Sequence, residues 1–208
     1  AADQKVFYIK TLLTESREFL VSRQQDQSEV ILFDTKDYLA STEGATATID
    51  YFEPSPDGRY LTLGVSVDGA EMGKILILDV AKKELLPEVI DRTMYGNPVW
   101  LPDSSGFFFF FLKKLSEKDS PAEMYHDSKV LFHKLGDQPS EDLEIFSRSL
   151  NLNLSLQEID FPFATVFPGS EDLFVYVYRG TSNDLTIFKA PLSEVLSSTS
   201  IDPWELLV

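Results

Sequence analysis

The sequence predicts an all-β protein, a β-propeller with about four blades in its 208 residues. Three observations predict this fold: a turn-and-strand pattern recurs along the chain, its strands are apolar on both faces, and helical periodicity is scarce. Repeats of about 40–50 residues that each hold several strands are typical of propeller blades. A β-sandwich with one apolar hairpin in each layer is the alternative that the repeats leave open.

The recurring pattern is clearest between residues 51 and 80. Residues 56–58 read Pro-Asp-Gly, in which proline presets one turn torsion, aspartate bonds nearby backbone and glycine accepts a positive φ. A second turn is expected at Asp68-Gly69. The strands that follow these turns, at 60–65 and 74–80, are apolar on both faces. Because a sheet with one exposed face alternates apolar and polar residues, this hairpin is predicted to be covered on both sides.

The same pattern of a turn cluster and an apolar strand recurs in three other places, at 14–23, 102–111 and 168–177. Each copy is followed by a second expected strand, at 29–34, 74–80, 129–133 and 184–188. Residues 107–111 are all phenylalanine, so alternation sends large apolar side chains to both faces of that strand. A short helical turn after Pro191 and a closing strand within 202–208 are also expected.

A long loop is predicted for the polar stretch at 113–128, which has no strand or helix period. His126 and His133 lie near acidic residues, but their spacing matches no recognised metal-ligand pattern. We therefore expect a histidine on a surface loop and a histidine at a strand end, with no metal and no cofactor.

The composition of the chain limits the kinds of partner that the protein is expected to bind and the compartments in which it is expected to occur. With 18 basic and 34 acidic residues the net charge is −16, which repels nucleic acid and anionic membranes. The chain has no cysteine, no apolar run long enough for a transmembrane helix, and no signal-peptide stretch at its start. The expectation is a protein without nucleic-acid or membrane partners, in the cytoplasm or the periplasm.

Several segments, in order along the chain, resemble the N-terminal propeller of the prolyl oligopeptidase family of serine peptidases. They are Ser55–Leu61, Trp100–Phe108, His133–Asp142, Arg179–Asn183 and Trp204–Val208. The most specific segment reads HKLGDQPSED at 133–142 and is similar to the family pattern YHxLGTxQSED. The resemblance runs from about Lys5 to the last residue. It implies a seven-bladed propeller stacked on an α/β-hydrolase domain, so residues 1–208 would form a partial propeller domain without that catalytic domain.

The resemblance also implies site residues. Phe108 matches a phenylalanine that lines a substrate subsite, and Phe174 lies near a second apolar lining position. A place in the strand core is the alternative for Phe108, which sits within the phenylalanine run. The loop at 122–138, with Tyr125, His126, Asp127 and Ser128, matches a mobile segment that gates substrate access; an ordinary blade insertion is the alternative.

No catalytic residue is expected in this chain, because it contains no G-x-S-x-G nucleophile elbow and neither histidine lies near such a motif. The functional hypothesis is a propeller fragment of a serine-type prolyl endopeptidase. It would shape the access of short proline-containing peptides to a catalytic domain of the same parent chain. Exposed blade edges and faces would favour self-association. A stand-alone propeller that binds a protein or peptide is the alternative, which the ending of the chain on a blade strand disfavours.

Overall fold

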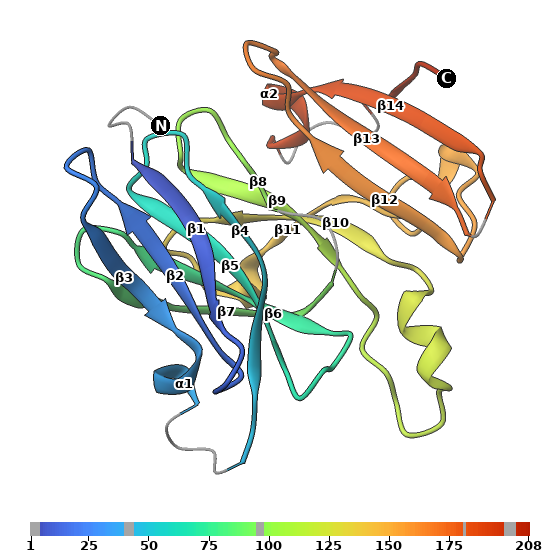
Figure 1. The fold of residues 1–208 in the computed structure, drawn as a ribbon. Coiled ribbons are helices and arrows are strands. Elements are labelled where there is room, and N and C mark those ends of the chain that lie inside the picture. The colour runs from blue at the N-terminus through green and yellow to red at the C-terminus, as the bar shows by residue number, and fades with distance from the viewer. Residues whose placement is uncertain (1–4, 40–43, 95–97, 181, 198–202) are drawn as a thin grey trace. The chain divides into compact units, whose positions relative to one another are not determined.

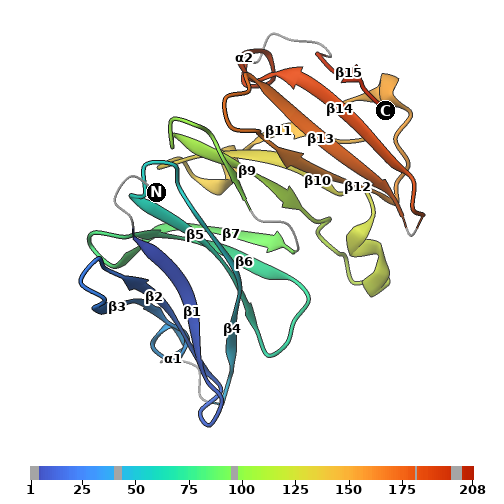
Figure 2. The ribbon, with the colours of Figure 1, turned by 45° about the horizontal axis from the view of Figure 1, so that its top comes forward.

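The computed structural model describes residues 5–39, 44–94, 98–180, 182–197 and 203–208. Within these ranges the chain forms four antiparallel sheets, here called sheets 1 to 4 in chain order, each made of consecutive strands (Figures 1 and 2). The chain divides into two compact units, Ala1–Asn97 and Pro98–Val208. The predicted fold class is confirmed: the protein is all-β and forms a partial propeller.

The first unit contains sheets 1 and 2. Sheet 1 has three strands, β1 (Val6–Leu12), β2 (Arg17–Arg23) and β3 (Glu29–Asp34), and is followed by the short helix α1 (Thr35–Tyr38). Sheet 2 has four strands, β4 (Ala47–Pro54), β5 (Tyr60–Val67), β6 (Gly73–Asp79) and β7 (Glu84–Thr93). One apolar cluster joins the two sheets, with Leu20 of β2, Leu63 of β5 and Leu76 of β6 among its buried members.

The second unit contains sheets 3 and 4. Sheet 3 comprises β8 (Val99–Trp100), β9 (Gly106–Phe111), β10 (Lys129–Lys134) and β11 (Leu143–Phe146). Sheet 4 comprises β12 (Asp160–Thr165), β13 (Asp172–Arg179), β14 (Leu185–Pro191) and β15 (Glu205–Leu206). The helical segments are η1 (Pro121–Tyr125), η2 (Pro139–Glu141), η3 (Leu152–Leu154) and α2 (Leu192–Val195). Sheets 3 and 4 share an apolar core that includes Phe108, Phe146, Val175 and Phe188.

The recurring turn of the sequence lies between the first and second strands of every sheet. In sheet 2 the Ser55 hydroxyl donates to Asp57 Oδ1 at 2.7 Å, and the same carboxylate oxygen accepts the Arg59 backbone N–H at 3.0 Å. In sheet 3 Asp103 accepts the Ser105 backbone N–H in the same way, at 3.0 Å. Each turn also holds a residue in the left-handed region: Ser16, Gly58, Ser104 and Gly169. The predicted turn chemistry is therefore confirmed, although a serine replaces glycine in two copies.

Burial on both faces is confirmed for four of the middle strands, β2, β5, β6 and β9. Every residue of β5 except its two ends is buried, and Phe107 to Phe110 of β9 are at most 5% exposed. In β13 the expectation is wrong. Its residues alternate between buried and more open positions, and Tyr178 remains 46% exposed. One face of β13 contributes Val175 to the core, whereas the other carries aromatic side chains that the described residues cover only in part.

The stretch predicted as a long loop forms no strand, but it contains the helical segment η1. The Ser120 backbone N–H donates to Glu123 Oε1 at 3.0 Å, which caps the first turn. Met124 is buried, and its carbonyl oxygen accepts the Lys113 backbone N–H at 3.1 Å. The loop prediction therefore missed one short helical segment, which capping and one buried anchor stabilise.

The two expectations for the last part of the chain are confirmed. Helix α2 follows Pro191 directly. Strand β15 pairs with β14, with Leu206 opposite Phe188. The start of the predicted closing strand, residue 202, lies outside the described residues. Among the residues described, no helix is long and apolar enough to cross a bilayer.

The close approach of β9 and β10 at Gly106 gives a first prediction. A methyl group there would overlap the His133 carbonyl oxygen and lie 2.6 Å from Phe132 Cζ. We expect Gly106→Ala to reduce the free energy of unfolding by about 3 kcal/mol, measured by chemical denaturation. Ser105→Ala, at the neighbouring exposed position, should cost less than about 1 kcal/mol. Equal, small effects of both substitutions would contradict the close approach.

Candidate functional site

Phe108, a predicted subsite residue, lies in the middle of β9. It pairs with Val99 of β8 and with Phe132 of β10, and the Phe108 and Phe132 rings are 5.1 Å apart between centroids. Its side chain is fully buried in the core of the second unit. This burial is what the strand-core interpretation expects, and the substrate-subsite role stays a prediction.

Phe174, the other predicted subsite residue, lies on the more open side of β13. It is half-buried and meets Phe167 edge to face, with ring centroids 5.0 Å apart and an interplanar angle of 68°. Phe167 is itself 46% exposed. Phe167 was not among the predicted site residues, although it stands directly before the Pro-Gly turn that leads into β13. The pair offers an aromatic contact surface to solvent, which a core position such as that of Phe108 does not.

Phe174 belongs to a larger aromatic surface on sheet 4. The register of β12 and β13 pairs Phe161 with Tyr178, Phe163 with Tyr176 and Thr165 with Phe174, which places their side chains on one side of the sheet. We call these five aromatic residues the aromatic face of sheet 4: Phe161, Phe163, Phe174, Tyr176 and Tyr178. The rings of Phe163 and Tyr178 are in contact, 5.8 Å apart between centroids. Such a surface suits apolar groups of a peptide or another protein layer.

The predicted gating loop is attached to sheet 4 by specific contacts. Tyr125, at the end of η1, lies edge-on to Phe161 of β12 at 6.1 Å between ring centroids. Ser128 is buried, and its hydroxyl donates to the Asp160 carbonyl oxygen at 3.1 Å. These contacts bring the loop next to one end of the aromatic face of sheet 4.

Between those two anchors, His126 and Asp127 form a turn. The His126 backbone N–H donates to the Glu123 carbonyl oxygen at 3.1 Å, and Asp127 has a φ of 53°. The Asp127 backbone N–H donates to the Glu158 carbonyl oxygen at 2.7 Å, and its carboxylate accepts from Arg148 Nε at 2.6 Å. A gating movement of the loop would have to break the two hydrogen bonds of Asp127 with Glu158 and Arg148, and the gating role stays a prediction.

The motif HKLGDQPSED contains a buried side-chain pair. His133 Nδ1 lies 2.7 Å from Asp142 Oδ1, and both side chains are almost fully buried. Burial raises the pKa of Asp142, an effect that the hydrogen bond with His133 partly opposes. His133 also packs against Phe107, with ring centroids 5.3 Å apart. The pair therefore joins β10 to the segment that leads into β11, which is a structural role.

His133 is thus the strand-end histidine that the sequence predicts, although it lies deep in the core. His126 lies in the loop, as expected. The described residues hold no group of three side chains that could bind a metal ion.

Comparison with known proteins connects this geometry to a family. A family model described as "Prolyl oligopeptidase, N-terminal beta-propeller domain" matches residues 1–190. The prolyl endopeptidase of Elizabethkingia meningoseptica is 31% identical over 101 residues, which cover 49% of this chain and 14% of that protein. Prolyl oligopeptidase A of Galerina marginata is 30% identical over 123 residues, or 51% of this chain and 17% of that protein.

Solved structures show the same fold. One prolyl endopeptidase structure matches with a TM-score of 0.79 at 23% identity, covering 99% of this chain and 28% of that chain. Prolyl oligopeptidase B of Galerina marginata, solved with a 25mer macrocyclization substrate, matches with a TM-score of 0.68 at 15% identity, covering 99% of this chain and 31% of that chain. The chain thus spans less than a third of these proteins. It belongs to the prolyl oligopeptidase N-terminal β-propeller family.

Proposed function

We propose that this chain is part of the propeller of a prolyl-oligopeptidase-like serine peptidase, whose catalytic α/β-hydrolase domain belongs to the same parent chain. The observation that carries the proposal is the family match over residues 1–190. Four consecutive antiparallel sheets support it, as does the coverage of only 28% of a solved prolyl endopeptidase. The propeller itself carries no catalytic triad in this proposal.

In the parent protein the propeller limits peptide access by size and contributes apolar surface near the catalytic pocket. The half-buried pair of Phe167 and Phe174 supports the second role, because aromatic rings open to solvent contact apolar peptide groups favourably. The loop with Tyr125, His126, Asp127 and Ser128 lies next to the same face, which is where a gating segment could act on a bound peptide. The substrate class is short peptides that contain proline.

The first test of this proposal measures hydrolysis. The pure chain is expected to release nothing from a short proline-containing reporter peptide, whereas the full-length parent should cleave it after proline. The parent should also cleave a short peptide faster than a long unfolded chain with the same cleavage sequence. Cleavage by the pure chain, sensitive to a serine-directed inhibitor, would contradict the absence of a triad. A parent that shows no preference for short peptides would contradict the size restriction.

Different outcomes are expected for the two predicted subsite residues. Phe108→Ala should reduce the free energy of unfolding by about 3–5 kcal/mol, because it empties a fully buried site. Phe174→Ala should cost about 1 kcal/mol and, in the parent, raise KM for a short proline-containing peptide several-fold with kcat nearly unchanged.

The matched control for Phe174 is Tyr178→Ala, on the same aromatic face of sheet 4. If both substitutions raise KM equally, the specific role of Phe174 is wrong. Chemical denaturation and steady-state kinetics provide the two measurements.

Self-association distinguishes a fragment of a larger propeller from an independent binding module. The aromatic face of sheet 4 is partly open, and the edge strand β3 carries Ile31, which is 53% exposed. Light scattering of the pure chain should therefore show concentration-dependent dimers or larger species. The substitution Tyr178→Lys should reduce association, whereas Lys36→Gln, at an exposed position of α1, should leave it unchanged. A monodisperse monomer at all concentrations would instead favour the stand-alone module.

A further inference from the structure

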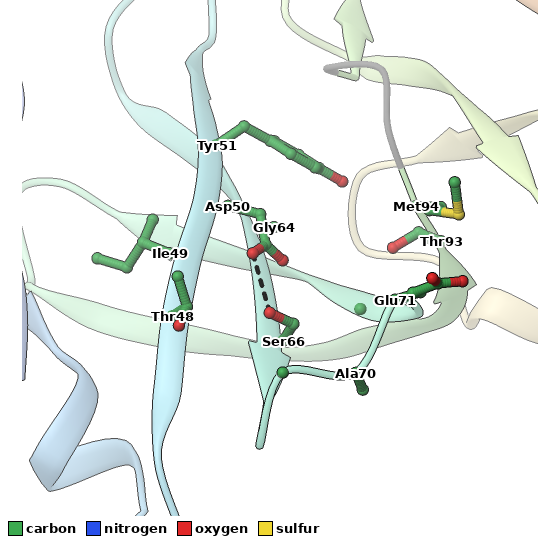
Figure 3. A pocket seen from close by; sticks show the side chains of 12 residues that line it. Thr48, Ile49, Asp50, Tyr51, Gly64, Ser66, Ala70, Glu71, Thr93 and Met94 are labelled. Carbon is green, nitrogen blue, oxygen red and sulfur yellow. Dashed lines mark hydrogen bonds between the residues drawn. The ribbon is translucent and has the colours of Figure 1, made fainter. Parts of the chain in front are cut away.

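A pocket of about 700 Å³ opens on sheet 2 of the first unit, far along the chain from the predicted site residues (Figure 3). Its walls come from β4, β5, the loop that leads into β6, and the end of β7. The lining residues include Asp50, Tyr51, Gly64, Ser66, Gly73 and Thr93. None of the residues described as lining this pocket is basic.

A β-bulge shapes the pocket. The register of β4 and β5 shifts between Ile49, which pairs with Val65, and Tyr51, which pairs with Gly64. Asp50 is therefore an extra residue without a partner on β5. Neighbouring side chains on a regular strand point to opposite faces, but Asp50 and Tyr51 both point into the pocket while Ile49 points away (Figure 3).

Two glycines make room for these side chains. A methyl group on Gly64 would lie 2.7 Å from Tyr51 Cδ1, so the tyrosine ring lies directly against the bare backbone of β5. A methyl group on Gly73 would lie 3.4 Å from Asp50 Oδ2 and 3.1 Å from the Val65 carbonyl oxygen. The absence of a side chain at Gly64 therefore makes room for the tyrosine ring, and its absence at Gly73 leaves the space next to the Asp50 carboxylate unfilled.

The polar groups of the pocket are mainly hydrogen-bond acceptors and hydroxyls. The buried Ser66 hydroxyl donates to Asp50 Oδ1 at 2.9 Å, which orients the carboxylate. Asp50 is exposed at the mouth of the pocket, yet partial burial of its carboxyl raises its pKa, and the nearby Glu18 adds to this effect. The described residues give Asp50 no cationic partner. A bound cation would offset both effects, because it favours the ionised carboxylate.

Tyr51 adds an aromatic ring and a hydroxyl to the pocket. Burial raises the pKa of Tyr51 to about 12, an effect that the neighbouring Thr93 partly opposes. The buried hydroxyl makes no hydrogen bond of good geometry with the described residues. A ligand with N–H donors could bond to this oxygen and to the Asp50 carboxylate, while the tyrosine ring stabilises its positive charge.

From this arrangement the geometry points to a binding site for an organic cation, an ammonium or guanidinium group on a short aliphatic stem. Such a group could come from a basic side chain of a peptide or from a free amine. This inference is independent of the proposed peptidase function, because it concerns residues of sheet 2 in the first unit and none of the residues used for that proposal. Its failure would leave that function untouched.

The test is a titration of the whole chain with small probe molecules at low salt. Two-dimensional amide NMR spectra monitor the binding. The probes are N-acetyl-lysine methylamide, N-acetyl-arginine methylamide and cadaverine, with the neutral N-acetyl-norleucine methylamide as the control ligand. We expect saturable shifts for at least one cationic probe, confined to residues 48–51, 64–73 and 93. Tighter binding of the amino-acid amides than of cadaverine would identify a peptide side chain as the source of the bound cationic group. Tighter binding of cadaverine would identify a free amine as that source.

Matched variants separate specific binding from the general attraction of a chain with net charge −16. Asp50→Asn keeps the shape of the side chain and should weaken binding about tenfold or more. Glu84→Gln removes one exposed charge at the start of β7 and should leave the affinity within about twofold. Circular dichroism of each variant verifies its fold.

Three results would overturn the inference. They are equal binding of the norleucine control, unchanged binding by Asp50→Asn, and shifts spread over the whole acidic surface. Should Asp50→Asn fail to fold, the map of shifts in the unsubstituted chain still decides between the pocket and the surface.

Discussion

The need to cover both faces of the middle strands is the constraint on which this structure depends. Strands β5 and β9 are buried on both sides, and the fully buried Phe107 and Phe108 illustrate why. Removing side chains of this size from water stabilises a fold by about 1.5–3 kcal/mol each, so a sheet with two apolar faces is unstable alone. Such sheets must occur in series, which is the logic of a propeller. The aromatic face of sheet 4 is an apolar face that the described residues cover only in part.

Features that depend on neighbouring residues in the chain could be predicted from the sequence. The turn at 56–58 is one example, because Asp57 bonds to backbone only two residues away. The strand at 106–111 is another, because a phenylalanine run allows few alternatives. The helical segment η1 could not be predicted, since its position depends on the burial of Met124 and on one capping bond from Ser120. Polar composition alone does not distinguish such a segment from a loop.

The burial of the candidate site residues could not be predicted from the sequence. Phe108 and Phe174 both occupy apolar strands, yet one is fully buried and the other half-exposed. This difference in burial depends on whether another part of the fold covers the face of the sheet on which each side chain lies. The residue type does not reveal it, because phenylalanine suits both environments. The bulge at Asp50 cannot be seen in the sequence for a related reason. No glycine or proline stands next to Asp50 in β4, and only the register against β5 reveals the extra residue. Register is a property of two strands and is not encoded in either one alone.

The repeated units provide an internal comparison for the pocket on sheet 2. Counted from Pro56 and Pro102, Gly64 and Ser66 correspond to Phe110 and Leu112 in the next copy. In that copy both positions are apolar and buried. A blade of this family is therefore able to fill this region with apolar side chains, and the propeller architecture does not require a glycine, a serine and a bulged aspartate there. Departures from a regular repeat that weaken packing are expected where a sequence serves binding as well as folding, and sheet 2 concentrates several of them around one opening.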